Sequence, residues 1–427
     1  MSTITVPPLL DSTGLQAVAE LNKIAHSISS LGKEIYGFIE HMDIGSPSSR
    51  IEWTDKNAIY TTPLTVDKTN GTFSLGDWQG FPVLANNKPY MVKSDGTPDY
   101  RLNETDYSKK LDGTASDVAN TAYDGGAFSW LQKIYKYESR QGNDRIVKFS
   151  FERYPGFLPI GFEDENGEEL EGVWLPMFYG TIVNNVAKCV ATGNCITGGN
   201  KTTAAQKDAI IAFNANAKFL GGPIVETIID LLMMFAKTSD LQGAYGSGNS
   251  NGYVNDSEQN YGMKDNAVVG GGQFFGTTSG TALNKIFHSI VLGSYQQWMR
   301  DPYEVVVNGR VKVSRNYVYD PTGALYYDTR IDVPDLTEGW KYPKLYHVVE
   351  GYGSIPDVSS AQGSTALGPC DGTYSTTQST FTAVSIRFGS CYSGGLAGPR
   401  ARHWRSSASD SSWHQGFAVL LKGPVAA

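Results

Sequence analysis

Closely spaced turn signals restrict the folding of this chain more than any other feature of its sequence. The pairs Asn70-Gly71, Asp95-Gly96 and Asp112-Gly113 divide the region between residues 50 and 169 into short segments. Such pairs are typical of tight hairpin turns, and short segments between turn signals favour strands. We therefore expect a strand-rich region, with strands at 50–53, 72–75, 90–93 and 145–152.

Composition and charge exclude several classes of protein. The 427 residues include 47 Gly, 24 Tyr, 18 Phe and 8 Trp but only 18% charged residues, which argues against both a disordered chain and an all-helical one. The net charge of −8 argues against a nucleic-acid-binding surface. No apolar run approaches the roughly 20 residues that span a bilayer, so we expect no membrane insertion. The N-terminal residues lack a secretory-signal pattern, which predicts folding in a reducing cytoplasm.

An N-terminal heptad pattern predicts a helix that assembles with copies of itself. Apolar residues spaced alternately by four and three form one seam: Ala17, Leu21, Ile24, Ile28, Leu31, Ile35, Phe38 and Met42. A 3.5-residue period is typical of coiled coils, and Ile at both kinds of seam position favours more than two strands. We expect a homotrimer whose oligomer contact comprises Leu21, Ile24, Ile28, Leu31, Ile35 and Phe38. A single amphipathic helix packed on its own domain is the alternative.

The periodicities divide the chain into three expected parts and predict an α+β fold class. Residues 1–45 would form the coiled-coil anchor, 46–125 a β-rich connecting domain, and 126–427 the third domain. One long helix is predicted at 224–235, where the apolar residues share a face, with a shorter companion at 208–219.

The sequence lacks the common enzyme motifs. It contains no G-x-x-x-x-G-K-[ST], no H-E-x-x-H and no G-x-S-x-G. Cys189 and Cys195 are spaced more widely than a usual zinc pair, and no second Cys or His pair lies near them, so core or loop thiols are the simpler interpretation. A Ser/His/Asp site drawn around His403 and His414 would need a geometry that sequence order cannot show. We expect no enzymatic activity, no cofactor and no bound metal.

The C-terminal segment has the most informative composition. Residues 384–388 and 417–421 alternate like half-buried strands. Residues 389–416 between them are rich in Tyr, Trp, Arg, His, Ser and Gly, which are the residue types that form recognition surfaces. The arginines of this region are interpreted either as solvated loop charges or as ligands for an anion.

These C-terminal residues resemble a known group of proteins. The segment Gly389-Ser390-Cys391-Tyr392-Ser393-Gly394-Gly395 is similar to the C-terminal region of C-type-lectin-like proteins related to the formylglycine-generating enzyme, a group that includes phage tropism determinants diversified by retroelements. Residues 229–248 and 285–303, and blocks between 76 and 117, resemble phage virion proteins of that class. The resemblance implies a C-type-lectin-like display domain with long inserted loops, presented as a trimer on a virion. The wide separation of Cys370 and Cys391 departs from the closely spaced pair of the enzyme and argues against oxidase activity.

The resemblance predicts a structural protein of a phage tail fibre or tail tip that binds a bacterial surface glycan or protein. Its N-terminal region would attach to other virion proteins. Aromatic rings would stack on the receptor, and arginines would pair with carboxylate or phosphate. The predicted receptor contacts are Tyr392, Arg400, Arg402, His403, Trp404, Arg405, Asp410, Trp413 and His414.

Two alternative functions remain open. The protein could be a capsid-attached head fibre or decoration protein, in which the C-terminal segment contacts neighbouring subunits. It could also be a surface depolymerase, since such enzymes use paired carboxylates and residues 163–171 offer several. The turn pair Asn166-Gly167 in that stretch favours a solvated hairpin instead.

Overall fold

The computed structural model describes residues 33–192, 198–248, 272–277, 283–334, 338–376, 382–391 and 393–426. The chain is β-rich, with 36% strand and 15% helix. The predicted α+β fold class, with a coiled coil and a separate C-type-lectin-like domain, is therefore wrong. Short helices fill the spaces between sheets, and no helix among the described residues is long and apolar enough to cross a membrane.

The coiled-coil prediction fails where it can be examined. Leu21, Ile24, Ile28 and Leu31 lie outside the described residues. Ile35 and Phe38 lie instead in β1 (Ile35–His41) and are buried there, 6% and 0% exposed. Gly37 explains the outcome, because an added Cβ would lie 2.7 Å from the carbonyl oxygen of Val147 on the neighbouring strand. Glycine disfavours a helix and permits this close approach of two strands.

The first sheet has four antiparallel strands and contains β1 near its centre. Its order is β2 (Ile51–Asp55), β1, β9 (Asp144–Ser150) and β8 (Tyr135–Gln141). The sheet therefore combines strands from both sides of the boundaries predicted at residues 45 and 125.

The second sheet has six strands and joins the chain's C-terminal strand to its early part. Its order is β13 (Lys218–Phe219), β24 (Val419–Lys422), β10 (Gly172–Pro176), β7 (Gly125–Gln132), β5 (Pro89–Lys93) and β6 (Pro98–Arg101). Because β5 pairs with β7, which in turn pairs with β10, residues after 126 do not fold apart from those before it.

The third sheet carries three of the predicted receptor contacts, Arg402, His403 and Trp404, on β22. Along its main path the order is β16 (Tyr327–Asp332), β15 (Arg310–Val313), β14 (Trp298–Val307), β21 (Thr382–Arg387), β22 (Arg402–Trp404), β20 (Thr373–Ser375) and β17 (Gly339–Lys341). β23 (Gln415–Gly416) pairs in parallel with β14 off this path.

Small hairpins and short helices complete the described structure. The hairpins are β3 (Thr65–Asp67) with β4 (Thr72–Ser74), β11 (Thr181–Val183) with β12 (Val186–Lys188), and β18 (Tyr346–Val349) with β19 (Gly353–Pro356). The α-helices are α2 (Pro82–Asn86), α3 (Thr203–Phe213), α4 (Pro223–Ala236), α5 (Leu241–Tyr245) and α6 (Ile290–Gly293). Single 3-10 turns occupy Lys56–Ile59, Gly76–Trp78, Val358–Ser360 and Gly394–Leu396.

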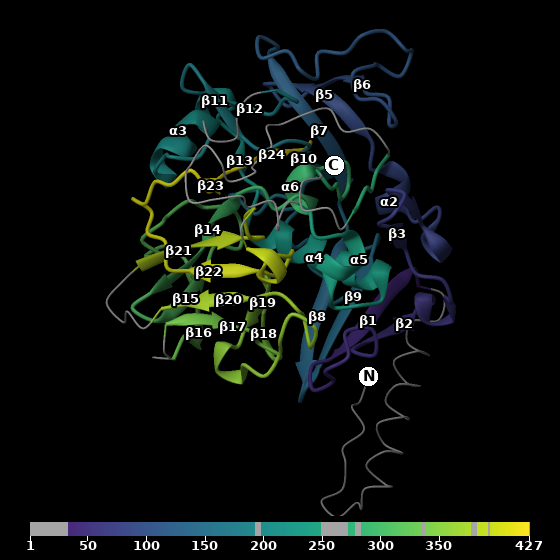
Figure 1. Ribbon diagram of the computed structural model, residues 1–427, viewed down its shortest axis with the longest axis vertical. Helices are drawn as coiled ribbons and strands as arrows, with labels where there is room; N and C mark the ends of the chain where they lie inside the picture. The colour runs from purple at the N-terminus through teal and green to yellow at the C-terminus, as the bar shows by residue number, and fades with distance from the viewer. Residues whose placement is uncertain are drawn as a thin grey trace, which may run out of the picture.

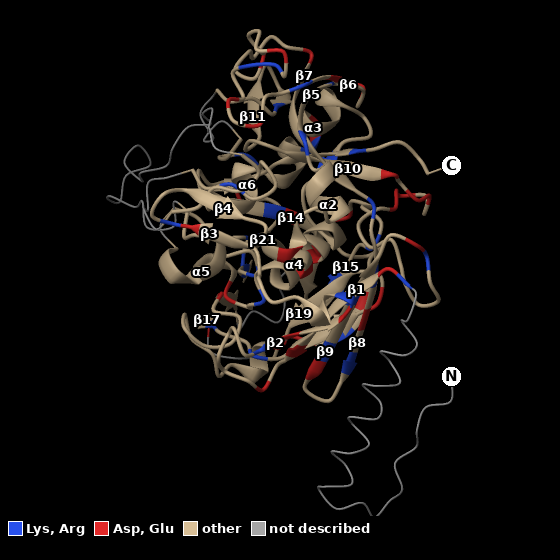
Figure 2. Cartoon of the chain, turned by 90° about the vertical axis from the view of Figure 1, so that its right-hand side faces the viewer, with Lys and Arg blue, Asp and Glu red and all other residues tan. Residues whose placement is uncertain are grey.

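Helix α4 lies at the centre of the molecule, with the first sheet on one side, the third on another and the second above it (Figure 1). Residues 223 to 235 are all buried, including two carboxylates, Glu226 and Asp230. Figure 2 shows acidic positions in red on α4, inside the fold. A buried charge is costly unless it is paired, so the surroundings of α4 must supply cations.

Candidate functional site

Strand β22 separates the predicted receptor contacts into two sets. Side chains alternate across a strand, so neighbouring residues point to opposite faces. Arg402 and Trp404 are buried, 0% and 1% exposed, whereas His403 is half-buried and Arg405 is exposed. The prediction that Arg402 and Trp404 contact a receptor is therefore wrong: their side chains lie inside their own subunit.

The outward face carries a row of three half-buried rings from neighbouring strands. Trp340 of β17 opposes Tyr374 of β20, and Tyr374 opposes His403 of β22. The Tyr374 and His403 rings stack, with centroids 4.5 Å apart and 14° between their planes. Trp340 meets Tyr374 edge-on at 5.3 Å and stacks on the buried Trp298 at 5.9 Å. We call Trp340, Tyr374, His403, Arg405 and Glu338 the aromatic surface.

Polar groups at the edge of the aromatic surface are held by one carboxylate. Arg405 lies 3.0 Å from Oε1 of Glu338, and the hydroxyl of Tyr374 donates to the same oxygen at 2.6 Å. The Arg405 side chain is 59% exposed, so its guanidinium keeps donors available to solvent or to a ligand. Burial lowers the pKa of His403 to about 3, which keeps its imidazole neutral at physiological pH.

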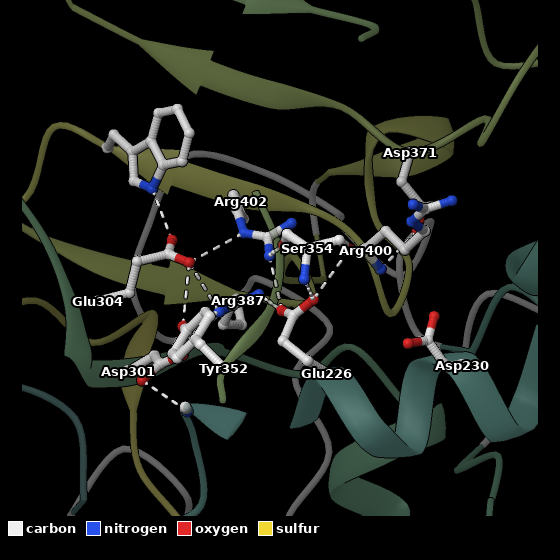
Figure 3. A network of polar contacts seen from close by, with 12 residues as sticks. Glu226, Asp230, Asp301, Glu304, Tyr352, Ser354, Asp371, Arg387, Arg400 and Arg402 are labelled. Carbon is white, nitrogen blue, oxygen red and sulfur yellow. Dashed lines mark hydrogen bonds and ion pairs between the residues drawn. The ribbon is translucent and has the colours of Figure 1, made fainter. Parts of the chain in front are cut away.

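Beneath the aromatic surface lies a buried ion network that we call the C-terminal network: Arg387, Arg402, Glu226, Asp301 and Glu304 (Figure 3). Arg387 contacts all three carboxylates, at 2.7 Å from Glu226, 2.9 Å from Asp301 and 3.0 Å from Glu304. Arg402 lies 2.6 Å from Glu226 and 3.3 Å from Glu304.

Neutral groups complete the hydrogen bonding of the C-terminal network. Nε1 of Trp404 donates to Oε1 of Glu304 at 2.8 Å. The hydroxyl of Tyr352 donates to Glu304 at 3.1 Å, and Arg402 donates to the backbone oxygen of Ser354 at 2.7 Å. The indole of Trp404 is thus a structural ligand of a buried carboxylate.

A bulge in β14 brings two of these carboxylates to one arginine. Asp301 opposes Ser385, whereas Val305 opposes Val384, so the intervening residues have no partner on β21. Residues three apart on a regular strand point to opposite faces, and a bulge can re-aim a side chain. The bulge allows Asp301 and Glu304 to contact the guanidinium of Arg387 together.

The two carboxylates of the bulge have opposite pKa shifts. Burial raises the pKa of Asp301 to about 6, with Arg387 opposing the shift and Glu304 adding to it. Burial also acts to raise the pKa of Glu304, but Arg387 and Arg402 outweigh it and lower that pKa to about 2. The C-terminal network therefore contains a carboxyl group that changes charge near pH 6.

A second network, which we call the N-terminal network, holds the predicted contact Arg400. Arg400, Arg50 and Arg145 lie 2.9, 2.8 and 2.8 Å from Glu40 of β1, and all four residues are buried. Burial acts to raise the pKa of Glu40, but the three arginines hold it well below its usual range. Arg400 also stacks over the Tyr346 ring at 3.7 Å. The prediction that Arg400 contacts a receptor is wrong, because its charge is used inside the fold.

Helix α4 joins the two networks. Glu226 belongs to the C-terminal network, and Asp230, one turn later, lies 2.7 Å from Arg145 and also pairs with Lys136. Lys136 and Arg145 reach Glu138 at 2.7 and 2.8 Å. Across both networks six cations face six carboxylates, so the charges balance when every carboxylate is ionised: Arg50, Lys136, Arg145, Arg387, Arg400 and Arg402 against Glu40, Glu138, Glu226, Asp230, Asp301 and Glu304.

Two of the remaining predicted contacts, Asp410 and His414, lie near the aromatic surface, since both act on the pKa of His403. Tyr392 is outside the described residues. Trp413 is 6% exposed, so the prediction that its ring contacts a receptor is wrong. His414 is half-buried; burial lowers its pKa to about 4, and its Nδ1 lies 2.7 Å from the Ser412 hydroxyl. Asp410 is exposed and accepts hydrogen bonds from the Ser407 backbone and hydroxyl, both at 2.8 Å.

Sequence reasoning missed three members of the aromatic surface. Trp340 and Tyr374 come from β17 and β20, which lie far from β22 in sequence, and Glu338 directly precedes β17. The only local signal for the two rings is an aromatic residue in a short extended segment, and that signal is common in this chain. Pairing of β20 with both β17 and β22 brings them together.

The acidic stretch forms a hairpin, as the turn pair suggested. Glu163 and Glu169 form an antiparallel bridge, and Gly167 has a φ of 80°. Glu169 is held by Lys133, Tyr135 and Arg153 at 3.1, 2.7 and 2.6 Å. Burial and the nearby Glu169 raise the pKa of Glu163.

Comparison of the chain with protein-family models and with curated proteins finds no match.

Proposed function

We propose that this protein is a receptor-binding component of a phage virion and that the aromatic surface makes the receptor contact. The observation that carries the proposal is the row of Trp340, Tyr374 and His403 across three paired strands, with Arg405 exposed beside it. Aromatic and arginine side chains dominate the energetics of recognition surfaces. The resemblance of several sequence blocks to phage virion proteins supports the virion assignment.

The C-terminal network supports a binding role because it keeps the surface rigid. Arg387 and Arg402 lie on the two strands that pair beside the aromatic row, and both are held by carboxylates of other elements. A preorganised surface loses less conformational entropy on binding, so more of the contact energy appears as affinity. Oligomerisation would add avidity.

The test is binding of labelled full-length protein to a panel of intact bacterial strains. On a strain that binds the wild type, Trp340→Ala and Arg405→Ala should each weaken binding by about tenfold. Tyr327→Ala is the matched control, because Tyr327 is 48% exposed on β16 at the opposite edge of the same sheet. Equal binding by all variants, or no strain bound, would contradict the proposal.

Antibody labelling of intact virions separates the receptor-binding function from a structural role on the capsid. Label at the tail supports receptor binding, and label on the shell favours a head fibre or decoration protein. Release of oligosaccharide from host capsule by the purified protein would instead indicate a depolymerase.

A further inference from the structure

A hollow lies on the six-stranded sheet, which is a different sheet from the one that carries the aromatic surface. It has a volume of about 630 Å³ and is lined by residues of β5, β7 and β10 and by the chain after β24. These strands lie in the upper part of the molecule in Figure 1. Its volume falls within the range of about 300–1,000 Å³ typical of small-molecule sites.

The sheet register places three aromatic rings on this face. Trp174 of β10 directly opposes Trp130 of β7, and their ring centroids are 4.7 Å apart. Tyr90 of β5 opposes Phe128, two residues before Trp130, and its ring lies 5.4 Å from that of Trp174. Trp130 and Tyr90 are half-buried, so both rings retain exposed surface.

Two glycines fix the ring of Trp130. A Cβ added to Gly172 or Gly423 would lie 2.5 or 2.6 Å from atoms of this ring. Only glycine leaves the space that the indole occupies, so the ring is held against two backbone segments. A ring fixed before binding loses little entropy when a ligand stacks on it.

One polar group at the hollow is left unpaired by folding. The Trp174 side chain is only 5% exposed, and its Nε1 is buried with no hydrogen-bond partner among the described residues. An unpaired buried donor is unfavourable, and Trp in such a position usually finds a partner. Because this nitrogen is itself buried, it is not a contact for a ligand, and binding at the hollow must rely on the exposed rings and the rim.

The charged groups at the rim of the hollow are mainly carboxylates, which accept hydrogen bonds. Asp95 and Glu171 are exposed at the rim, beside the amide of Asn86. Lys422 also lines the hollow, but its ammonium pairs with Glu165 and lies 3.8 Å from Asp164. Carboxylates accept hydrogen bonds from hydroxyl groups and repel anions.

We propose that this hollow binds a neutral saccharide. The C–H face of a sugar ring would stack on Trp130 and Tyr90, and its hydroxyls would donate to Asp95 and Glu171. A quaternary ammonium fits less well, because an aromatic cage surrounds its cation with rings, whereas Trp130 and Tyr90 each pack against Trp174. An acidic saccharide would meet two carboxylates. The site is separate from the aromatic surface and does not depend on the proposed function.

The test uses saturation-transfer NMR with the full-length protein and defined trisaccharides. Maltotriose, mannotriose and the N-acetylglucosamine trimer serve as neutral probes, and trigalacturonic acid serves as the acidic one. We expect saturable binding of at least one neutral probe at up to about 10 mM, a range in which weak sites are detected. Trp130→Ala should weaken that binding by at least about tenfold.

Two further variants keep the test decisive. Trp340→Ala, on the aromatic surface, should bind the trisaccharide like the wild type. Glu171→Gln changes an exposed side chain and should weaken binding several-fold even if Trp130→Ala fails to fold. No binding of any neutral probe, stronger binding of trigalacturonic acid, or unchanged binding by every folded variant at this site would overturn the proposal. Loss of cell binding by Trp340→Ala alone bears only on the proposed function.

Discussion

Arg402 and Arg405 show how the position of a residue on one strand decides its role. Both belong to the same basic, aromatic segment, and their side chains are 1% and 59% exposed. The buried guanidinium pairs with Glu226 and Glu304, whereas the exposed one pairs with Glu338. Breaking a buried pair leaves an uncompensated charge, but an exposed pair is worth little.

Substituting each arginine by methionine should therefore change the free energy of unfolding by very different amounts. Arg402→Met should lower the free energy of unfolding by about 3–5 kcal/mol, because Glu226 and Glu304 lose a partner. Arg405→Met should change it by less than about 1 kcal/mol while weakening receptor binding. Urea unfolding followed by tryptophan fluorescence measures both values. Similar losses of stability in the two variants would show that Arg402 is not held as described.

Asp301 should make stability depend on pH between about 4 and 6. Its pKa is raised by burial to about 6, so the folded protein binds a proton that the unfolded chain releases above pH 4. The resulting stabilisation is fully present below the unfolded pKa and is lost as the pH rises through 6. Compared with Asp301→Asn, the wild type should gain on the order of 1–3 kcal/mol as the pH falls from 7 to 4.

Thermal unfolding of both proteins across this pH range is the measurement. The lowered pKa of Glu304 contributes stability that is lost at acidic pH, but this contribution is expected in both proteins and largely cancels in their difference. A constant difference between the two melting temperatures from pH 4 to 7 would contradict the assigned shift.

Among the elements, α4 connects parts of the fold that share no strand. Glu226 faces the arginines of β21 and β22, and Asp230 faces Arg145 of β9 and Lys136 of β8. Gly353 of β19 permits close contact with the helix, since an added Cβ there would lie 2.4 Å from Cβ of Glu226. The helix thus fixes two sheets by charge as well as by apolar packing.

Neutralising the two carboxylates of α4 should loosen different sheets. Glu226→Gln should speed amide exchange in β21 and β22, and Asp230→Asn should speed it in β8 and β9, each by at least about tenfold. Hydrogen–deuterium exchange with peptide resolution distinguishes the two patterns. Equal acceleration in both sheets for either variant would argue against separate networks.

At the scale of the molecule, the sequence predicts individual strands and helices better than it predicts which of them pack together. The strands expected at 90–93 and 145–152 are close to β5 and β9, and the helix expected at 224–235 is α4, because turn pairs and apolar spacing act over a few residues. The helix expected at 208–219 begins and ends earlier, as α3, and Phe219 lies in β13. The apolar segments 384–388 and 417–421 do overlap β21 and β24.

The packing of these elements depends on contacts between residues that lie far apart in sequence. Charge on Arg400 and Arg402 suggested exposed residues, since nothing near them reveals Glu40, Glu226 or Glu304 as partners. Of the residues of the aromatic surface, the sequence predicts only His403 and Arg405. Trp340 and Tyr374 became neighbours of those residues through strand pairing, which periodicity does not specify.

The position of β24 between β13 and β10 has a consequence for biosynthesis. Residues 172–176 and 218–219 emerge from the ribosome well before residues 419–422, and until then their edges are unpaired. A nascent chain that stalls before this point would expose strand edges that attract other chains. Strands β10 and β13 can therefore complete their shared sheet only after residue 422 has been synthesised.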